Sequence, residues 1–240
     1  MIKLLGHRGY KALYPENTIS AINKAFELSD GVEFDIQKSQ DGKFVIIHDE
    51  TIDRTSNGKG FIKEMTLQQL KEFDFGDGDR ISSLDELLNN APENKFINIE
   101  LKHQTITQDD IPTLINIIKT YYDTRFIIVS SFNPALLLGF KEFNIKIGYL
   151  VGDPYFDYKI LTIIKNTLKL KPNYLNLPVK YFTEYSVIKK MLFEFFLFIM
   201  NIKIMTWTVN NEEELKAVLN KSEFIITNEI EKLKILLKRS

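Results

Sequence analysis

Residues 31–49 read GVEFDIQKSQDGKFVIIHD and predict two consecutive strands joined by an Asp-Gly turn. Glu33 and Asp35 lie two residues apart between apolar residues, so a strand here points both carboxylates to one face and the apolar side chains to the other. The second apolar run ends at His48, which brings an imidazole back toward these carboxylates. Two carboxylates so close together need either a raised pKa or a bound cation.

The rest of the chain alternates strands with helices. Further strands are predicted at 2–6, 96–102, 125–130, 146–150, 174–177, 203–209 and 223–227, and helices at 16–28, 83–88, 108–121, 156–168, 183–200, 211–219, briefly after 134 and at the end to 238. Residues 50–80, rich in Asp, Gly, Thr and Lys, are predicted to be an insertion with one helical patch. About eight strand-helix units favour a parallel (β/α)₈ barrel over a doubly wound sheet. Residues 1–240 are therefore expected to form one barrel domain.

Chemically active side chains fall where such a barrel carries its active site. In a TIM barrel these groups lie at the carboxyl ends of the strands. The residues at or near predicted strand ends are His7, Glu33, Asp35, His48, Glu100, Lys102 and Trp207. These residues are the candidates for the functional site.

A third carboxylate is expected to join the first two. Residues 96–102 read FINIELK, and the alternation places Asn98, Glu100 and Lys102 on one face, which in a barrel points inward. Glu100 can then meet Glu33 and Asp35. Three carboxylates without cysteine or a histidine cluster favour a hard cation, Mg²⁺ or Ca²⁺, over zinc. The alternative is a set of solvated strand-end charges or a network of salt bridges.

Two of the three histidines have neighbouring residues that suggest a catalytic role. His7 follows the first strand beside Arg8, and His48 follows the turn region beside an aspartate. The pair is expected to act as general acid and general base. His103 lacks such neighbours and is expected to be an ordinary surface residue. Arg8 and Lys102 could bind phosphate oxygens, or they could neutralise the acids.

The amino-acid composition excludes some classes of binding partner. The chain has 31 basic and 32 acidic residues, so it has no global charge that attracts nucleic acid. It has no cysteine, and its N-terminal apolar run is too short for a signal peptide or a membrane helix, so a cytoplasmic location is expected. Residues 191–200, MLFEFFLFIM, are expected to pack in the core, with a peripheral membrane or partner patch as the alternative.

Eight short motifs in order give the chain a family resemblance. They are HRG (7–9), PENT (15–18), GVEFDI (31–36), DGKFVIIHD (41–49), T-x-x-R-T-x-x-G-x-G (51–60), NIELK (98–102), SSF (130–132) and TWTVN (206–210). Together they resemble the glycerophosphodiester phosphodiesterase family. The resemblance implies a TIM barrel with a small insertion after the second strand, here about 50–80.

The resemblance also implies roles for single residues. It implies one divalent cation at Glu33, Asp35 and Glu100, an acid/base pair at His7 and His48, phosphate contacts from Arg8 and Lys102, and a glycerol pocket lined by Trp207. One departure is visible at the last strand. Family members often have Thr-Asp-x-Pro there, and this chain has Asn228 in place of the aspartate. Asn228 is expected to cap the final helix.

The expected reaction is metal-dependent hydrolysis of glycerophosphodiesters, such as glycerophosphocholine or glycerophosphoethanolamine, to glycerol 3-phosphate and an alcohol. Either water or the glycerol 2-hydroxyl can be the nucleophile, and the second gives a cyclic phosphate first. One rival is a lipid-directed phosphodiesterase that acts at a membrane surface, and another is a barrel that binds phosphate esters without catalysis. A small-molecule substrate is expected, with no nucleic acid and no stable membrane insertion, and a homo-oligomer stays open.

Overall fold

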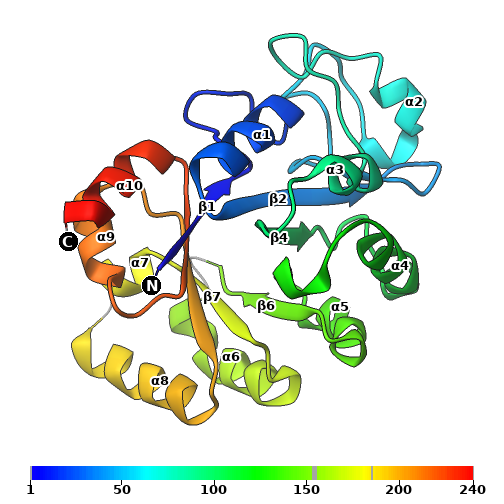
Figure 1. Ribbon diagram of the computed structural model, residues 1–240. Helices are drawn as coiled ribbons and strands as arrows, with labels where there is room; N and C mark the ends of the chain where they lie inside the picture. The colour runs from blue at the N-terminus through cyan, green and yellow to red at the C-terminus, as the bar shows by residue number, and fades with distance from the viewer. Residues whose placement is uncertain (1, 153–155, 185, 240) are drawn as a thin grey trace.

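The protein folds into a closed barrel of eight parallel strands with helices around it (Figure 1). The structure is a computed structural model and describes residues 2–152, 156–184 and 186–239. Each barrel strand pairs with its neighbours in chain order, and the pairing of β1 with both β2 and β9 closes the ring. The short strand β3 pairs antiparallel with β2 outside the ring. The predicted TIM barrel is confirmed.

The strands are β1 (Lys3–His7), β2 (Gly31–Lys38), β3 (Phe44–Ile46), β4 (Phe96–Leu101), β5 (Ile127–Ser131), β6 (Lys146–Leu150), β7 (Tyr174–Pro178), β8 (Lys203–Trp207) and β9 (Phe224–Thr227). The α-helices are α1 (Ile19–Leu28), α2 (Leu67–Leu70), α3 (Leu84–Asn90), α4 (Ile111–Tyr121), α5 (Pro134–Leu137), α6 (Phe156–Leu170), α7 (Lys180–Glu184), α8 (Val187–Ile199), α9 (Glu212–Val218) and α10 (Ile230–Arg239).

Two predicted helices differ from those observed. The first was expected from residue 16, but α1 begins at Ile19, because the Thr18 side chain caps it by accepting a hydrogen bond from the Ala21 amide. Asn17, directly before the cap, has a positive φ of 59° that no helix interior allows. The single helix expected over 183–200 is two helices, α7 and α8, of which α7 begins directly after β7.

The alternation on β2 and β4 has the predicted orientation. Val32, Phe34 and Ile36 on β2 are buried in the cluster between barrel and helices, together with Ile97 and Ile99 on β4. The intervening polar residues therefore point into the barrel. Lower in the barrel its interior is apolar and filled by a separate cluster: Leu5, Ile128, Tyr174, Met205, Phe224 and Ile226. The polar chemistry is thus confined to the upper part of the barrel.

Close approach of β2 and β4 depends on a glycine. A side chain at Gly31 would collide with the backbone carbonyl of Phe96, its partner in the pairing of the two strands. Glycine at this position lets the strands pair in the register that sets Asp35 beside Glu100. The two strands that supply all three carboxylates are therefore neighbours in the barrel.

The insertion has a small core of its own. Its apolar residues Ile52, Ile62, Leu70 and Phe75 join Val45, Ile47 and Ile81 in a cluster apart from the main one. Figure 1 shows this segment, drawn in cyan, to one side of the barrel beyond α1 and α3. Its only α-helix among the described residues is the one-turn α2, where Thr66 and Gln69 form a capping box.

The expectation that residues 191–200 pack in the core is wrong for half of the run. Phe193 and Leu197 are buried, but Phe195 and Phe198 are 61% and 79% exposed. Nearly every residue of the run is apolar, so the sequence carries no periodicity that separates an inner from an outer face. None of the described helices is long and apolar enough to cross a membrane.

Candidate active site

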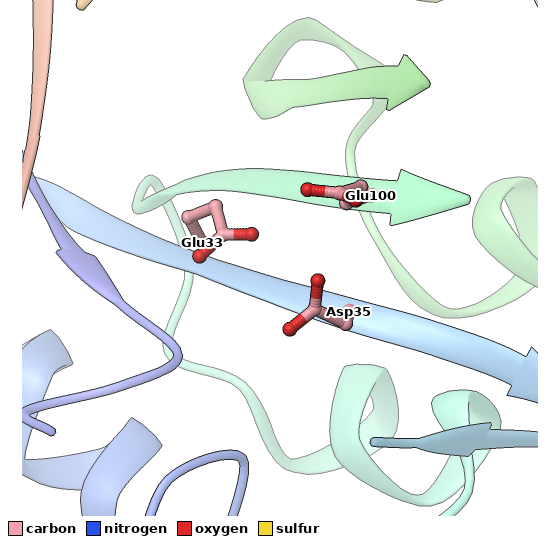
Figure 2. Close-up of side chains that lie close together, drawn as sticks. All are labelled: Glu33, Asp35 and Glu100. Atoms are coloured by element: carbon pink, nitrogen blue, oxygen red, sulfur yellow. The ribbon is translucent and has the colours of Figure 1, made fainter. Parts of the chain in front are cut away.

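Three carboxylates meet inside the barrel mouth. Glu33 and Asp35 come from β2 and Glu100 from β4, and Figure 2 shows the three side chains turned toward one another. One oxygen of each lies within 4.8 Å of the others, and all three residues are at least nine-tenths buried. The predicted convergence of the three acids is therefore observed.

Two cations lie against this trio. The Lys102 Nζ atom is 2.7 Å from Asp35 Oδ1 and also contacts Glu100. The Arg8 backbone amide donates to Glu33, and its Nε atom is 3.3 Å from Asp35. Three carboxylates face two cationic side chains, so the group retains an excess of negative charge. In the structure Arg8 and Lys102 neutralise the acids, which is one of the two roles expected for them.

The carboxylates differ in acidity because their neighbours differ. Burial, with repulsion from Asp35, raises the pKa of Glu33 well above its usual range and that of Glu100 to about 7. Burial alone would also raise the pKa of Asp35, but attraction to Lys102 and Arg8 outweighs it and holds that pKa low. A divalent cation would supply the missing positive charge, and three carboxylates are a donor set that suits Mg²⁺ or Ca²⁺. The residues therefore fit the group that the sequence predicts.

His7, at the end of β1, is held by an uncharged partner. Its Nδ1 atom lies 2.7 Å from the side-chain oxygen of Asn228, an acceptor, and this contact favours the tautomer with the proton on Nδ1 and an unprotonated Nε2. Burial and the charge of Arg8 lower the pKa of His7 to about 4. The Asn228 side chain, which is expected to cap the last helix, thus contacts His7. Asn228, the residue at which this chain departs from the family pattern, is therefore the hydrogen-bond partner of His7.

His48 is held by a charged partner. Its Nδ1 atom lies 2.7 Å from Asp49 Oδ1, and the second oxygen of Asp49 accepts from Arg54 Nε at 2.6 Å. Burial lowers the pKa of His48, while Asp35 and Asp49 oppose that shift. A carboxylate next to an imidazole favours its protonated form more than an amide does. The two histidines therefore differ in the partner of their Nδ1 atom, which is an amide oxygen for His7 and a carboxylate for His48.

One cavity brings the candidates together. It has a volume of 190 Å³ and is lined by His7, Arg8, Glu33, His48, Asn98, Glu100, Lys102, Phe132, Leu150, Trp207 and Ile226. The Trp207 ring packs edge-to-face on Phe132 with centroids 6.0 Å apart. A larger hollow of 1120 Å³ at the opposite end of the barrel contains none of the candidates. His103 is exposed and does not line the 190 Å³ cavity.

Four residues that support the site were not predicted to belong to it. Glu16 binds Arg8, Lys11 and Arg54, and Asn17 donates to Asp35 at 3.0 Å. Both belong to the PENT motif, which was the available signal. Asn228 lies in the last-strand motif and Phe132 lies in SSF. Neither motif indicates what the side chain of that residue contacts.

Glu16 allows a test of how the site is held together. Its side chain is 8% exposed and its pKa is held low, because ion pairs with Arg54, Lys11 and Arg8 outweigh the effect of burial. We expect Glu16→Gln to lower the free energy of unfolding at pH 7 by about 2 kcal/mol, less than for a fully buried pair because Arg54 is half exposed. A depressed folded pKa gives stability that is present above the unfolded value of about 4.3 and is lost on acidification. The difference from wild type should therefore shrink below about pH 4.

Urea unfolding at neutral and acidic pH measures this difference. The control is Glu27→Gln, which removes a pair between Lys24 and a 63% exposed carboxylate and should change nothing measurable. Equal stabilities of wild type and Glu16→Gln at pH 7 would contradict the prediction.

Comparison with known proteins agrees with this geometry. Residues 7–232 match the Glycerophosphoryl diester phosphodiesterase family. A glycerophosphodiester phosphodiesterase of Caldanaerobacter subterraneus subsp. tengcongensis is 34% identical over 96% of this chain and 95% of its own. The crystal structure of the glycerophosphodiester phosphodiesterase from Thermotoga maritima is 32% identical, with a TM-score of 0.83 over 99% of this chain and 98% of its own.

A more distant structure shares the fold. A phosphodiesterase of Oleispira antarctica, solved in complex with the product sn-glycerol-3-phosphate, is 22% identical with a TM-score of 0.80 and covers 98% of this chain and 96% of its own. The family match covers most of the chain, and the first relative matches nearly its whole length. The chain therefore belongs to the glycerophosphoryl diester phosphodiesterase family and is a phosphodiesterase of that family.

Proposed function

We propose that this phosphodiesterase hydrolyses soluble glycerophosphodiesters, such as glycerophosphocholine and glycerophosphoethanolamine, to glycerol 3-phosphate and an alcohol. The proposal includes a divalent cation, Mg²⁺ or Ca²⁺, at Glu33, Asp35 and Glu100, and His7 and His48 as the acid/base pair. The observation that supports it best is that the three carboxylates converge and that Glu33, Glu100 and both histidines line one cavity. The bound cation would act as a Lewis acid on the phosphoryl oxygens, a contribution of several kcal/mol.

The partners of the two histidines support a division of labour. The lowered pKa of His7 favours its neutral form, and its contact with Asn228 favours a proton on the nitrogen that faces Asn228, which leaves the other nitrogen able to accept the proton of the attacking hydroxyl. His48 has the carboxylate of Asp49 at its Nδ1, which stabilises an imidazolium that can protonate the leaving alcohol. We therefore assign the base to His7 and the acid to His48. Either water or the glycerol 2-hydroxyl can supply the attacking oxygen.

The lining of the cavity supports substrate roles for Arg8, Lys102 and Trp207. Arg8 and Lys102 line it, and the buried Nε atom of Arg8 lies 3.3 Å from Asp35 but makes no hydrogen bond. When a cation balances the carboxylates, both side chains have donors for phosphate oxygens. Trp207 and Phe132 form an aromatic wall on the same cavity, which suits the carbon face of glycerol.

We also propose that residues 1–240 act as one domain, with the insertion as part of the site. Arg54, from the insertion, donates to Asp49 and to Glu16 at 2.6 Å each. These contacts join the residue that orients His48 to the residue that orients Arg8. The insertion therefore supports both the proposed acid/base pair and the proposed phosphate-binding residues.

A turnover assay tests the function. Glycerophosphocholine, glycerophosphoethanolamine and glycerophosphoglycerol are each supplied with Mg²⁺ or Ca²⁺, and released glycerol 3-phosphate is measured. We expect turnover of at least one of them at a kcat of about 1–10³ s⁻¹, the usual range for enzymes. Binding without turnover of any would support a non-catalytic barrel. Faster turnover of vesicle phospholipid than of any soluble diester would support the lipid-directed rival.

A further inference from the structure

The outer side of α8 has the polarity of a buried surface. Ile188, Met191, Leu192, Phe195, Phe198 and Ile199 are 61–79% exposed. Their spacing of three and four residues places them along one side of the helix. The helix lies at the periphery of the molecule (Figure 1). A helix on a barrel surface normally presents polar residues to water, so this side is unusual.

The described polar residues of α8 turn to the protein instead. The Lys190 ammonium donates to the backbone carbonyl of Phe182 at 2.7 Å, and Glu194 pairs with Lys221 at 3.1 Å. Phe193 and Leu197 complete the inner side and are buried. The fold of the barrel thus uses the inner side of α8 fully and leaves the outer side without a partner among the described residues.

The segment that includes α6 and the exposed stripe is rich in lysine. Residues 156–203 contain eight lysines and three acidic residues, although the whole chain has a net charge of −1. Lys165 and Lys169 are exposed on α6, the helix before α8 in the ring, and form no ion pair within the part of the chain that the structure describes. The same outer side of α6 carries Leu161, which is 78% exposed. Exposed apolar side chains beside the unpaired Lys165 and Lys169 match the chemistry of an anionic bilayer surface.

We propose that the outer side of α8, flanked by α6, docks the protein on the surface of a bilayer that contains anionic lipid. The helix has 13 residues, too few to span a membrane, so it lies in the interface with its aromatic side chains among the acyl chains. The lysines then face the lipid head groups. A second copy of the chain is the weaker occupant, because a two-fold pairing through this stripe would bring the same unpaired lysines together.

Vesicle flotation tests the proposal with the full chain. The wild type is expected to float with vesicles of equal phosphatidylglycerol and phosphatidylcholine, and to bind about tenfold more weakly to pure phosphatidylcholine or in about 0.5 M NaCl. Phe195→Ser with Phe198→Ser is expected to weaken vesicle binding by about tenfold or more. Lys165→Glu with Lys169→Glu should weaken binding to the anionic vesicles alone.

The matched control is Leu13→Ser with Ile235→Ser, which removes two exposed apolar side chains far from α8 in the sequence and should leave vesicle binding unchanged. Normal turnover of glycerophosphocholine by the phenylalanine variant shows that its fold is intact, since neither residue lines the active-site cavity. The proposal is overturned if the wild type stays unbound, or if the phenylalanine variant binds as the wild type does. It is also overturned if sedimentation shows a dimer that this variant dissociates while neither protein binds vesicles.

Discussion

Replacing His7 or His48 with alanine is expected to lower kcat by about 10²–10⁴-fold, the usual contribution of a positioned acid or base. Both residues line the 190 Å³ cavity with Glu33 and Glu100, and each has one ring nitrogen engaged by a fixed partner. The remaining nitrogen is therefore the one that handles a proton. KM should change far less than kcat, because a proton is transferred only in the transition state.

The third histidine is the matched control. His103 is exposed and lies outside the cavity, so His103→Ala should retain wild-type kcat. His7→Ala also leaves the Asn228 side chain without its partner, which costs about 1–3 kcal/mol of stability. Circular dichroism at the assay temperature separates this loss from a loss of catalysis, and His7→Gln keeps a polar partner for Asn228. Near-normal turnover by a folded His7 or His48 variant would remove that residue from the mechanism.

The carboxylate site is the part of the protein that its sequence predicts best. Strand alternation assigns Glu33, Asp35 and Glu100 to inward faces, and a parallel barrel brings the ends of its strands to one mouth. Both steps need only local pattern and topology, so the convergence within 4.8 Å could be anticipated. The helix boundaries were harder, as the start of α1 at Ile19 shows, because a cap depends on the backbone at Asn17 and Thr18.

Contacts between distant loops could not be predicted in this way. Asn228 meets His7 across 221 residues, and Arg54 meets Glu16 across 38. No periodicity relates such residues, because loops have none. The sequence could not predict which side of α8 faces the protein, and the reason is a different one. An almost uninterrupted apolar run allows any rotation of the helix, and only the packing of Phe193 and Leu197 selects one.

Removal of divalent cations with a chelator is expected to abolish turnover, and Mg²⁺ or Ca²⁺ is expected to restore it. Without the cation the site has three carboxylates against two cationic side chains, and burial raises the pKa of Glu33 and Glu100. A phosphodiester brings a further negative charge into that cavity, which the site then cannot balance. Full activity in chelator would refute the metal assignment, and calorimetric titration of the stripped protein measures cation binding independently of turnover.

Glu100→Gln sharpens this test because it keeps the shape of the side chain and removes one negative charge. Glu100 contacts Lys102 but lacks the contacts with Arg8 and Asn17 that hold Asp35, so its replacement disturbs the scaffold least. We expect weaker cation binding and a kcat/KM lower by about 10²-fold or more, since the Lewis-acid contribution amounts to several kcal/mol. The control Asp109→Asn removes an exposed carboxylate and should leave both quantities unchanged. Unaltered cation affinity in Glu100→Gln would mean that the trio is a network of salt bridges, the alternative that its sequence also allows.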